Sequence, residues 1–423
     1  MTCSSSSAIH PCFDKEARHR YGRIHLPVAP HCNVQCRFCN RSFDCVNESR
    51  PGVTSQLLTP DQAIWYLDRA VERVPDLRVV GIAGPGDPFA NPRQTMETLR
   101  LVRAGHPQMA LCVSTNGLAV TEHIPALVDL GVRHLTITVN ALSARVAAAI
   151  YRWVRDGSRI VHDDEAGACI LEHQDAAIRA AHAAGMILKI NHVCVPGVND
   201  HESVAIAAHV AEMGADLFNL IPFLPAPGSH FFGRPAADPQ AITALRTAAE
   251  RHLPQMTHCA RCRADAIGRI GAGCSSDAQD LLKEAATMSP APTEDRPYVA
   301  VASMEGMLVN LHLGHCQRFL LYAADQDSFN LVAVREAPSP GEPDRWERLA
   351  DVLHDCSAVV CTDAGGPPQQ ILRQFGITVH ATEGMIDEAL ELVFSGQEDR
   401  LRTPLCSSGK SCGDCSGGGG LCG

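Results

Sequence analysis

The sequence predicts an α/β protein of two units, because strand-like and helix-like segments alternate through most of its 423 residues. Apolar, β-rich segments recur between about residues 77 and 253, and helical patterns separate them. This alternation is typical of parallel strands joined by helical crossovers, in a sheet that is either open or curled into a barrel. Glycine and polar residues gather directly after the strands, where α/β proteins position their functional sites.

The first unit is expected to begin its regular structure with a helix over residues 58–74. Thr59 is a suitable N-cap, Pro60 fits the first helical position, and Gln62 completes a capping box. The strand candidates that follow are residues 77–84, 110–117, 134–141, 187–197 and 216–225, with helical patterns over 165–185 and 202–214.

The second unit follows a change of composition at about residues 275–297, which indicates a linker. Its elements are expected in the order β-β-β-α-β-α-β-α, which predicts a compact mixed-sheet domain of roughly a hundred residues. The strands are predicted at 298–303, 318–324, 331–336, 357–364 and 377–382, and the helices at 344–355, 367–375 and 384–394. After residue 400 the chain is too glycine-rich to pack, and we expect disorder.

Composition indicates a soluble globular protein without nucleic-acid or membrane partners. The net charge of −11 disfavours both nucleic acid and an anionic membrane surface. No run of 18 apolar residues occurs, and the N-terminal segment lacks the features of a signal peptide. We therefore expect a cytoplasmic location, where most of the nineteen cysteines would ligate metal rather than form disulfides. Cys169 and Cys194 are exceptions, expected to be small buried hydrophobic residues.

Cys32, Cys36 and Cys39 form a C-x3-C-x2-C motif on one short loop. Three thiolates at this spacing can hold three irons of a four-iron cluster and leave the fourth iron open to a small molecule. Zinc is the alternative, although it prefers C-x2-C pairs with a fourth ligand nearby. About 45 residues further on, Gly84 and Gly86 lie in the loop GIAGPGDP, whose backbone can approach a ligand closely, and Asp87 adds a carboxylate.

Together, the cysteine motif and the glycine loop resemble those of the radical S-adenosylmethionine (SAM) superfamily, in which such a turn binds the methionine amino group. The usual acidic residue there is glutamate, so Asp87 departs from the pattern. Longer segments resemble the NifB family of nitrogenase cofactor-maturation proteins through about residues 10–270. These segments are residues 10–53, 81–92, 114–117, 136–141, 195–200 and 258–268.

The resemblance implies a partial (β/α)6-type TIM barrel that carries a 4Fe–4S cluster with bound SAM and takes two further 4Fe–4S clusters as substrates. In that family the two clusters are fused, with insertion of a SAM-derived carbide and a sulfur. The product is NifB-co, the 8Fe–9S–C precursor of the iron–molybdenum cofactor (FeMo-co). The implied partners are iron–sulfur cluster donors and cofactor carrier or scaffold proteins of nitrogenase assembly, and an electron donor such as ferredoxin or flavodoxin.

The same resemblance guides the choice of substrate-cluster ligands. We group Cys112, Cys259 and Cys262 as ligands of one cluster, with core packing of Cys112 and a zinc site at the C-x2-C pair as alternatives. The other cluster is assigned to His10, Cys12 and Cys45, with Glu48 as an additional oxygen ligand or acid/base. The histidines that can replace His10 in this role are His19, His25 and His31.

Asparagines after successive strands are the candidates for contacts with SAM. Asn116 and Asn140 are expected near its carboxylate or ribose, and Asn191 with the turn 196–199 near its adenine. Each can also be an ordinary turn residue, since asparagine and glycine dominate turns.

The C-terminal unit resembles the NifX-like cofactor-binding domain, which has a ribonuclease H-like fold. His312, His315 and Cys316 lie close together in its sequence and can contact an iron–sulfur cargo or form a plain turn. The tail cysteines, which can touch clusters transiently, are Cys406, Cys412, Cys415 and Cys422. The predicted domains are an N-terminal segment with candidate ligands (1–24), the radical SAM core (25–274), the linker (275–297), the NifX-like domain (298–396) and a flexible Cys/Gly-rich tail (397–423).

Two other functions fit parts of the sequence. A radical SAM enzyme acting on an organic substrate would use the extra cysteines for auxiliary clusters. A non-catalytic cluster carrier would match the C-terminal unit and the cysteine-rich tail, and it predicts no SAM cleavage.

Overall fold

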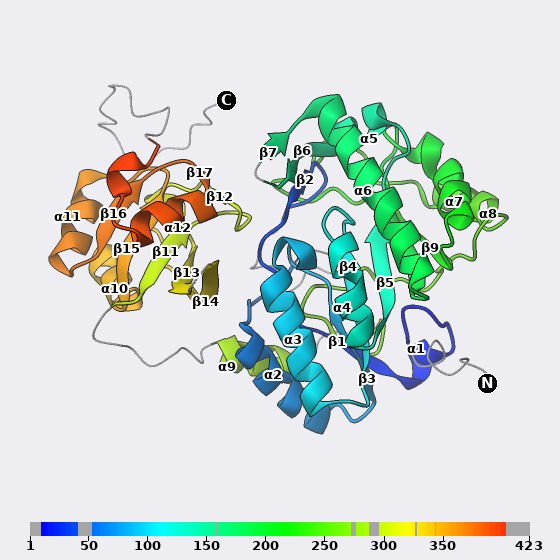
Figure 1. Ribbon diagram of the computed structural model, residues 1–423, viewed down its shortest axis with the longest axis horizontal. Helices are drawn as coiled ribbons and strands as arrows, with labels where there is room; N and C mark the ends of the chain where they lie inside the picture. Colours follow the sequence, from blue (N-terminus) through cyan, green and yellow to red (C-terminus); the bar gives the residue numbers. More distant parts are fainter. Residues whose placement is uncertain are drawn as a thin grey trace. The chain divides into compact units, whose positions relative to one another are not determined.

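The chain divides into two compact units, Met1–Pro290 and Ala291–Gly423, as the computed structural model shows (Figure 1). The structure describes residues 10–40, 53–157, 159–271, 276–286, 296–325, 328–342 and 344–402. Two predicted site residues, Cys45 and Glu48, and the four tail cysteines lie outside the described residues.

A seven-stranded sheet of order β10-β1-β3-β4-β5-β8-β9 forms the centre of the first unit. All neighbours from β1 to β9 run parallel, and β10 adds an antiparallel edge to β1. The strands are β1 (Gly22–His25), β3 (Leu77–Ile82), β4 (Ala110–Thr115), β5 (Val132–Thr138), β8 (Ile187–Cys194), β9 (Leu217–Pro222) and β10 (Ile267–Gly268). The predicted fold class is confirmed, because the parallel strands form a curled half-barrel.

Helices cover the outer face of this sheet, and α2, α3, α4 and α6 lie over its strands in Figure 1. The helices of the unit are α1 (Ala17–Arg20), α2 (Pro60–Arg73), α3 (Pro92–Gly105), α4 (Ile124–Asp129), α5 (Ala144–Ile150), α6 (Asp163–Ala183), α7 (Ser203–Glu212), α8 (Pro239–Ala249) and α9 (Ser276–Ala286). Leu111 and Val113 of β4 belong to the core beneath the helices, whereas Cys112 and Ser114, which alternate with them along the strand, line a cavity. The two-residue period of a strand therefore separates core residues from site residues.

The predicted capping box at the start of α2 is confirmed. The Thr59 hydroxyl accepts a hydrogen bond from the Gln62 backbone N–H at 3.4 Å, and the Thr59 N–H donates to Gln62 Oε1 at 2.8 Å. Pro60 occupies the first helical position, where its missing N–H costs nothing.

Helix α9 lies within the segment that composition led us to expect as a linker. Leu281, Leu282 and Ala285 are buried in the core of the first unit, and α9 packs against α2. The segment is polar on average, so its composition does not indicate a helix. Its apolar residues nevertheless fall at positions i, i+1 and i+4, which form one face of a helix.

A three-stranded sheet of β2 (Val34–Cys36), β6 (Tyr151–Asp156) and β7 (Arg159–Val161) was not predicted. Its strands are short, and β2 pairs with a partner more than a hundred residues away in sequence. This sheet matters for the site, because β2 belongs to the loop that carries the C-x3-C-x2-C motif.

The second unit is the predicted mixed-sheet domain with its own core. Its five-stranded sheet has the order β14-β13-β11-β15-β16, parallel on the β15 side of β11 and antiparallel on the β13 side. The strands are β11 (Tyr298–Ala302), β13 (Arg318–Asp325), β14 (Ser328–Glu336), β15 (Cys356–Cys361) and β16 (Thr378–Ala381), with a small β12 (Leu308–Val309) and β17 (Gly384–Met385) pair. The helices are α10 (Arg345–Val352), α11 (Gly366–Gln374) and α12 (Ile386–Phe394).

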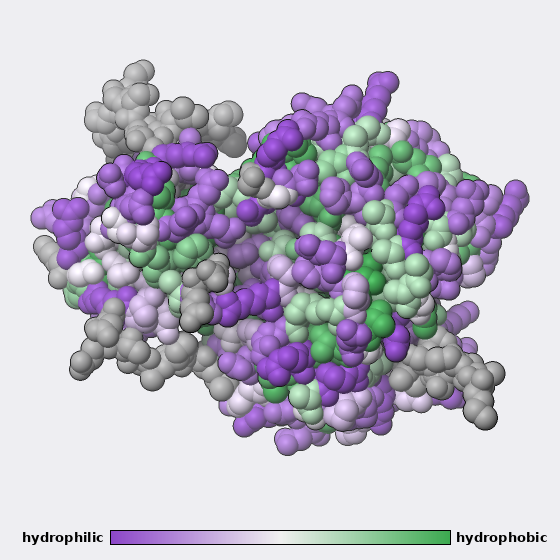
Figure 2. Space-filling view, in the orientation of Figure 1, coloured by the Kyte–Doolittle hydropathy of each residue, from purple (hydrophilic) through white to green (hydrophobic). Residues whose placement is uncertain are grey.

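Polar and charged side chains dominate the face in view in Figure 2, with smaller hydrophobic groups between them. Among the described residues, no helix is both long and apolar enough to cross a membrane.

Candidate active site

The glycine loop packs directly on the segment that leads into the cysteine motif. The Gly86 N–H donates to the Ala29 carbonyl at 2.7 Å, and the Asp87 N–H donates to the His31 carbonyl at 2.7 Å. Ala29 and Pro85 form a parallel bridge between the two loops. A Cβ at position 86 would overlap the His31 carbonyl group, so only glycine fits this position without moving the cysteine loop.

Asp87 is buried, and its side chain forms hydrogen bonds with neighbouring protein groups. Its carboxylate accepts hydrogen bonds from the Asn116 N–H at 2.6 Å, the Phe89 N–H at 2.9 Å and the Thr115 hydroxyl. Burial raises the pKa of Asp87, and these hydrogen bonds act in the opposite direction. Both carboxylate oxygens of Asp87 are thus engaged by the protein, which joins the glycine loop to the end of β4, and a role of Asp87 in binding SAM stays a prediction.

Cys32, Cys36 and Cys39 are all partly exposed. Cys36 ends β2, which pairs with β6, and the Cys39 N–H donates to the Cys36 carbonyl at 3.1 Å. Tyr151 lies buried beneath the loop; burial and the nearby Cys36 and Cys32 raise its pKa. A loop anchored on one side by β6 and on the other by the glycine loop suits a cluster that binds three thiolates.

The predicted asparagines have different environments. The Asn116 amide donates to Asn33 Oδ1 at 2.7 Å, beside the cysteine motif, and its own oxygen accepts from the Leu118 N–H. Asn140 is fully buried; its oxygen accepts from the Val193 N–H, and its amide donates to the Tyr151 hydroxyl. Asn140 therefore stabilises the strand ends, and the structure does not present its side chain to a ligand.

A cavity of about 110 Å³ opens inside the half-barrel and brings together cysteines that are far apart in sequence. The thiols that line it are those of Cys12, Cys112, Cys259 and Cys262, and its other polar side chains include His10, His25, Lys189, Asn191 and Asn219. From the sequence, we assigned Cys12 to a different cluster from the other three cysteines. The structure places all four thiols around one cavity, and Cys12 is close enough to Cys259 and Cys262 for their charges to affect its pKa.

The register of the parallel strands explains how Cys112 meets a histidine. His25, Gly81, Cys112 and His134 are consecutive neighbours across β1, β3, β4 and β5. A Cβ at Gly81 would lie 2.9 Å from Cys112 Sγ and 3.1 Å from the His25 ring. Gly81 therefore leaves the space in which the thiol and the imidazole approach each other across β3.

The C-x2-C pair lies on a loop that is tied to the N-terminal segment. The His258 ring is hydrogen-bonded to the Pro11 carbonyl at 2.9 Å, which brings Cys12 next to this loop. The Arg261 N–H donates to Cys259 Sγ at 3.4 Å, and the Arg23 guanidinium donates to Cys262 Sγ at 2.8 Å. Donors aimed at sulfur stabilise the thiolate form that binds metal.

The remaining thiols are held in a low-dielectric environment. Burial raises the pKa of Cys112 to about 12, with the nearby Cys12 adding to the effect. Burial likewise raises the pKa of Cys12, while the Lys189 ammonium lowers the pKa of both thiols. These thiols are therefore protonated at neutral pH until a metal displaces the proton.

His25 has the hydrogen bonding of a metal ligand. From the sequence, His10 and His25 were both candidates for this role. His25 Nδ1 lies 2.9 Å from the Arg263 carbonyl and donates to it, so Nε2 keeps its lone pair on the cavity side. Burial lowers the pKa of His25 to about 4, which keeps the ring neutral. His10 Nδ1 instead accepts from the Cys12 N–H, so its buried Nε2 carries the proton. The geometry favours His25 over His10 as the ligand.

Within the described residues, no three His, Cys, Asp or Glu side chains are arranged to hold a single metal ion. A cluster does not require such an arrangement, because each of its ligands binds a different iron.

Comparisons with known proteins assign both units of the chain to families. Residues 26–210 match the family model of the radical SAM superfamily, and residues 296–396 match the model described as dinitrogenase iron–molybdenum cofactor. The FeMo cofactor biosynthesis protein NifB of Chlorobaculum tepidum is 50% identical over 92% of this chain and 92% of its own length. The chain belongs to the NifB family. The NifB protein of Klebsiella pneumoniae is 39% identical over 88% of this chain and 87% of its own length. The NifB protein of Frankia alni is 36% identical over 90% of this chain and 86% of its own length.

The NifB-family C-terminal unit does not present the predicted His312, His315 and Cys316 set to a cargo. Cys316 is 1% exposed, its thiol donates to the Arg318 carbonyl at 2.8 Å, and burial raises its pKa to about 12. The rings of His312 and His315 lie 5.2 Å apart, and the Cys316 thiol belongs to the core of the domain. His312 Nδ1 accepts from the Gly314 N–H within a short turn, which fits the plain-turn alternative.

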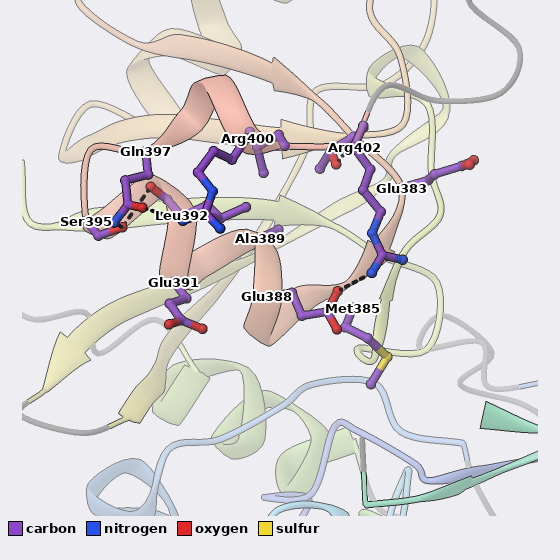
Figure 3. Close-up of a pocket in the computed structure, with 12 residues that line it drawn as sticks. Glu383, Met385, Glu388, Ala389, Glu391, Leu392, Ser395, Gln397, Arg400 and Arg402 are labelled. Carbon is purple, nitrogen blue, oxygen red and sulfur yellow. Dashed lines mark hydrogen bonds and ion pairs between the residues drawn. The ribbon is translucent and has the colours of Figure 1, made fainter. Parts of the chain in front are cut away.

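A hollow of about 350 Å³ on this unit lies beside α12 and the short helix η6 (Glu398–Arg400) (Figure 3). Four of its polar side chains form two pairs: Arg402 with Glu388 at 3.3 Å, and Arg400 with Gln397 at 2.7 Å. The described residues that line it include no cysteine or histidine, so they offer no ligand for an iron–sulfur cargo.

Proposed function

We propose that this chain fuses two 4Fe–4S clusters, with insertion of a SAM-derived carbide and a sulfur, into the 8Fe–9S–C precursor of FeMo-co. The observation that carries the proposal is the meeting of four thiols and the His25 imidazole in one cavity inside a radical SAM half-barrel. An organic substrate would not need so many soft ligands in its binding cavity.

The residues divide into two groups with separate tasks. Cys32, Cys36 and Cys39 would hold the resident cluster, which when bound supplies the electron for reductive cleavage of SAM. The glycine loop holds the cysteine loop in place through Gly86, and Asp87 joins it to the end of β4. By family analogy, one SAM molecule would donate its methyl group to a substrate-cluster sulfide, and a second SAM molecule, reductively cleaved, would supply the radical that removes hydrogen from that methyl group.

The cavity ligands would hold the substrate clusters. Cys112, Cys259 and Cys262 remain the proposed ligands of one cluster, and Cys12 and Cys45 of the other, with His25 in place of His10. Glu48 stays a proposed acid/base. The proposed partners are cluster donors, cofactor carriers and a low-potential electron donor of nitrogenase assembly.

Anaerobic reconstitution followed by product analysis tests this function. With SAM labelled in its methyl carbon, we expect roughly twelve irons per chain, from three four-iron clusters, and label in an acid-labile iron–sulfur product. Four irons per chain with no labelled cluster would contradict the proposal. SAM cleavage with the label in an organic product would indicate the alternative enzyme, and absence of deoxyadenosine would indicate a carrier.

Three serine variants separate the two groups of cysteines. Cys36→Ser should abolish SAM cleavage, whereas Cys112→Ser should lower the iron content and the labelled product while deoxyadenosine still forms. Cys169→Ser is the matched control, because this partly buried thiol on α6 lies outside both groups. Equal behaviour of Cys112→Ser and Cys169→Ser would contradict the assignment of the cavity.

A further inference from the structure

Lys189 is a buried cation in the middle of the thiol cavity. It lies on β8 with 7% of its surface exposed, and its side chain lines the same cavity as the four cysteines. Lys189 pairs in register with Thr136 on β5. Thr136 is two residues after His134, on the same face of the sheet, and His134 is the neighbour of Cys112. Lys189 thus projects from the sheet just above the row that carries the Cys112 thiol.

The ammonium of Lys189 has no carboxylate beside it in the described part of the chain. None of the ion pairs among the described residues includes Lys189, and its Nζ lies 4.7 Å from the centre of the Phe13 ring. Phe13 in turn packs edge-on against His134, which holds the ring in place. Lysine is almost never buried unless it is paired, since removing its charge from water costs several kcal/mol.

The cavity that Lys189 lines contains thiols, imidazoles, amides and the side chain of Arg261. The lysine ammonium lowers the pKa of Cys12 and Cys112, and it also lowers the pKa of His10 and of His134, the latter to about 4 together with burial. The ammonium thus disfavours further positive charge in the cavity and favours negative charge. A four-iron cluster held by several thiolates is anionic, because the thiolates bring more negative charge than the iron–sulfide core neutralises.

We propose that Lys189 is a counter-charge of the substrate clusters, beside the Arg23 guanidinium at Cys262, and helps make this cavity selective for an anionic iron–sulfide cargo. This inference rests on the proposed function and adds a positioning residue to it: Lys189 binds no iron but stabilises the charge of the clusters that the cavity thiols hold. It contributes most when the cluster is reduced, since each added electron increases the negative charge that the ammonium offsets.

Replacement of Lys189 by methionine or arginine, in the full chain, tests this role. Lys189→Met keeps the length and apolar stem but removes the charge, so the metal-free variant should have a higher Tm than the wild type. The reconstituted Lys189→Met variant should lose its substrate-cluster iron to a chelator roughly tenfold faster, the size expected for one lost charged contact. The midpoint potential of these clusters should become more negative. Lys189→Arg should restore the potential and the iron retention.

Lys283→Met is the matched control, because Lys283 is exposed on α9, and it should change none of these quantities. A lower Tm of metal-free Lys189→Met would show a structural role and overturn the proposal. Unchanged potential and iron retention would do the same. A weaker SAM affinity with unchanged cluster potential would assign Lys189 to the SAM carboxylate and also overturn it. If the wild type takes up only four irons per chain, the proposed function itself is contradicted. If the wild type takes up all three clusters and Lys189→Met has the same potential and iron retention, only the role of Lys189 is contradicted.

Discussion

At the scale of single residues, small side chains and buried hydrogen bonds decide where the chemistry is placed. Gly81 and Gly86 both stand where a Cβ would displace a functional group: the Cys112 thiol in one case and the cysteine loop in the other. The sequence marked Gly86 as part of a ligand-binding turn, but the contact that requires glycine is with the chain itself. This contact joins segments more than fifty residues apart, so no local pattern contains it.

Gly86→Ala should abolish binding of the resident cluster. The added methyl group would overlap the His31 carbonyl and push the cysteine loop away from the glycine loop, so we expect loss of SAM cleavage and of about four irons per chain. Gly105→Ala at the end of α3 is the control, because nothing lies within 4 Å of a Cβ there. Iron analysis and deoxyadenosine assays give the answer, and wild-type values for Gly86→Ala would refute the steric argument.

His192 should make the first unit sensitive to acid. Its Nδ1 is bonded to the Val139 carbonyl and its Nε2 to the Ser203 hydroxyl, and burial lowers its pKa from 6.5 to about 4. The unfolded chain therefore binds more protons in this range. The stabilisation is complete above pH 6.5 and is lost as the pH falls through 4, by up to about 3 kcal/mol.

Denaturant unfolding at several pH values checks this effect. The variant His192→Asn should be less stable at pH 7, but its free energy of unfolding should fall less between pH 6.5 and pH 4 than that of the wild type. The exposed His201 offers the control variant His201→Asn, which should keep the wild-type slope. Equal slopes for His192→Asn and wild type would exclude this histidine as a source of acid sensitivity.

At the scale of elements, the strands predicted for both units formed near their predicted places, because the burial pattern of a strand is visible in its own sequence. Other elements escaped prediction, among them β1 and β10 of the central sheet and the β12-β17 pair. The β2-β6-β7 sheet consists of short strands whose pairing is non-local. Helix α9 was hidden in a polar segment, although its apolar residues have helical spacing. The β2-β6-β7 sheet supports the cysteine loop, and α9 packs in the core of the first unit.

Leu282→Ala should destabilise the first unit by about 2–5 kcal/mol, the cost of a cavity at a buried leucine. Leu282 is 2% exposed and belongs to the core shared with α2, which a linker residue would not be. Lys283→Ala, on the exposed face of the same helix, should change stability by less than about 0.5 kcal/mol. Thermal unfolding distinguishes the two, and equal small effects would mean that α9 contributes nothing to the core.

At the scale of the whole molecule, the two units have separate hydrophobic cores and should unfold in separate transitions. The C-terminal unit contains a buried ion pair in which both Arg335 nitrogens lie 2.6 Å from the Asp355 carboxylate. Breaking such a pair leaves a buried charge without a partner and costs about 3–5 kcal/mol.

Asp355→Asn should therefore lower one calorimetric transition and leave the other in place, whereas Leu282→Ala should do the reverse. The control is Glu336→Gln, since Glu336 forms an exposed ion pair with Arg318 that is worth at most about 1 kcal/mol. A single transition that moves with both variants would show that the units unfold together.

The sequence alone was enough to predict the fold class, most strands of the two main sheets and the residue types that carry the chemistry. Strand and helix periods and the C-x3-C-x2-C spacing are local, so they can be recognised without a structure. Only the tertiary structure decided that Cys12 joins Cys112, Cys259 and Cys262, that His25 presents its free nitrogen to them, and that Lys189 lies in their midst. These neighbours are up to 250 residues apart, and they meet because strand register and loop packing bring them to one cavity.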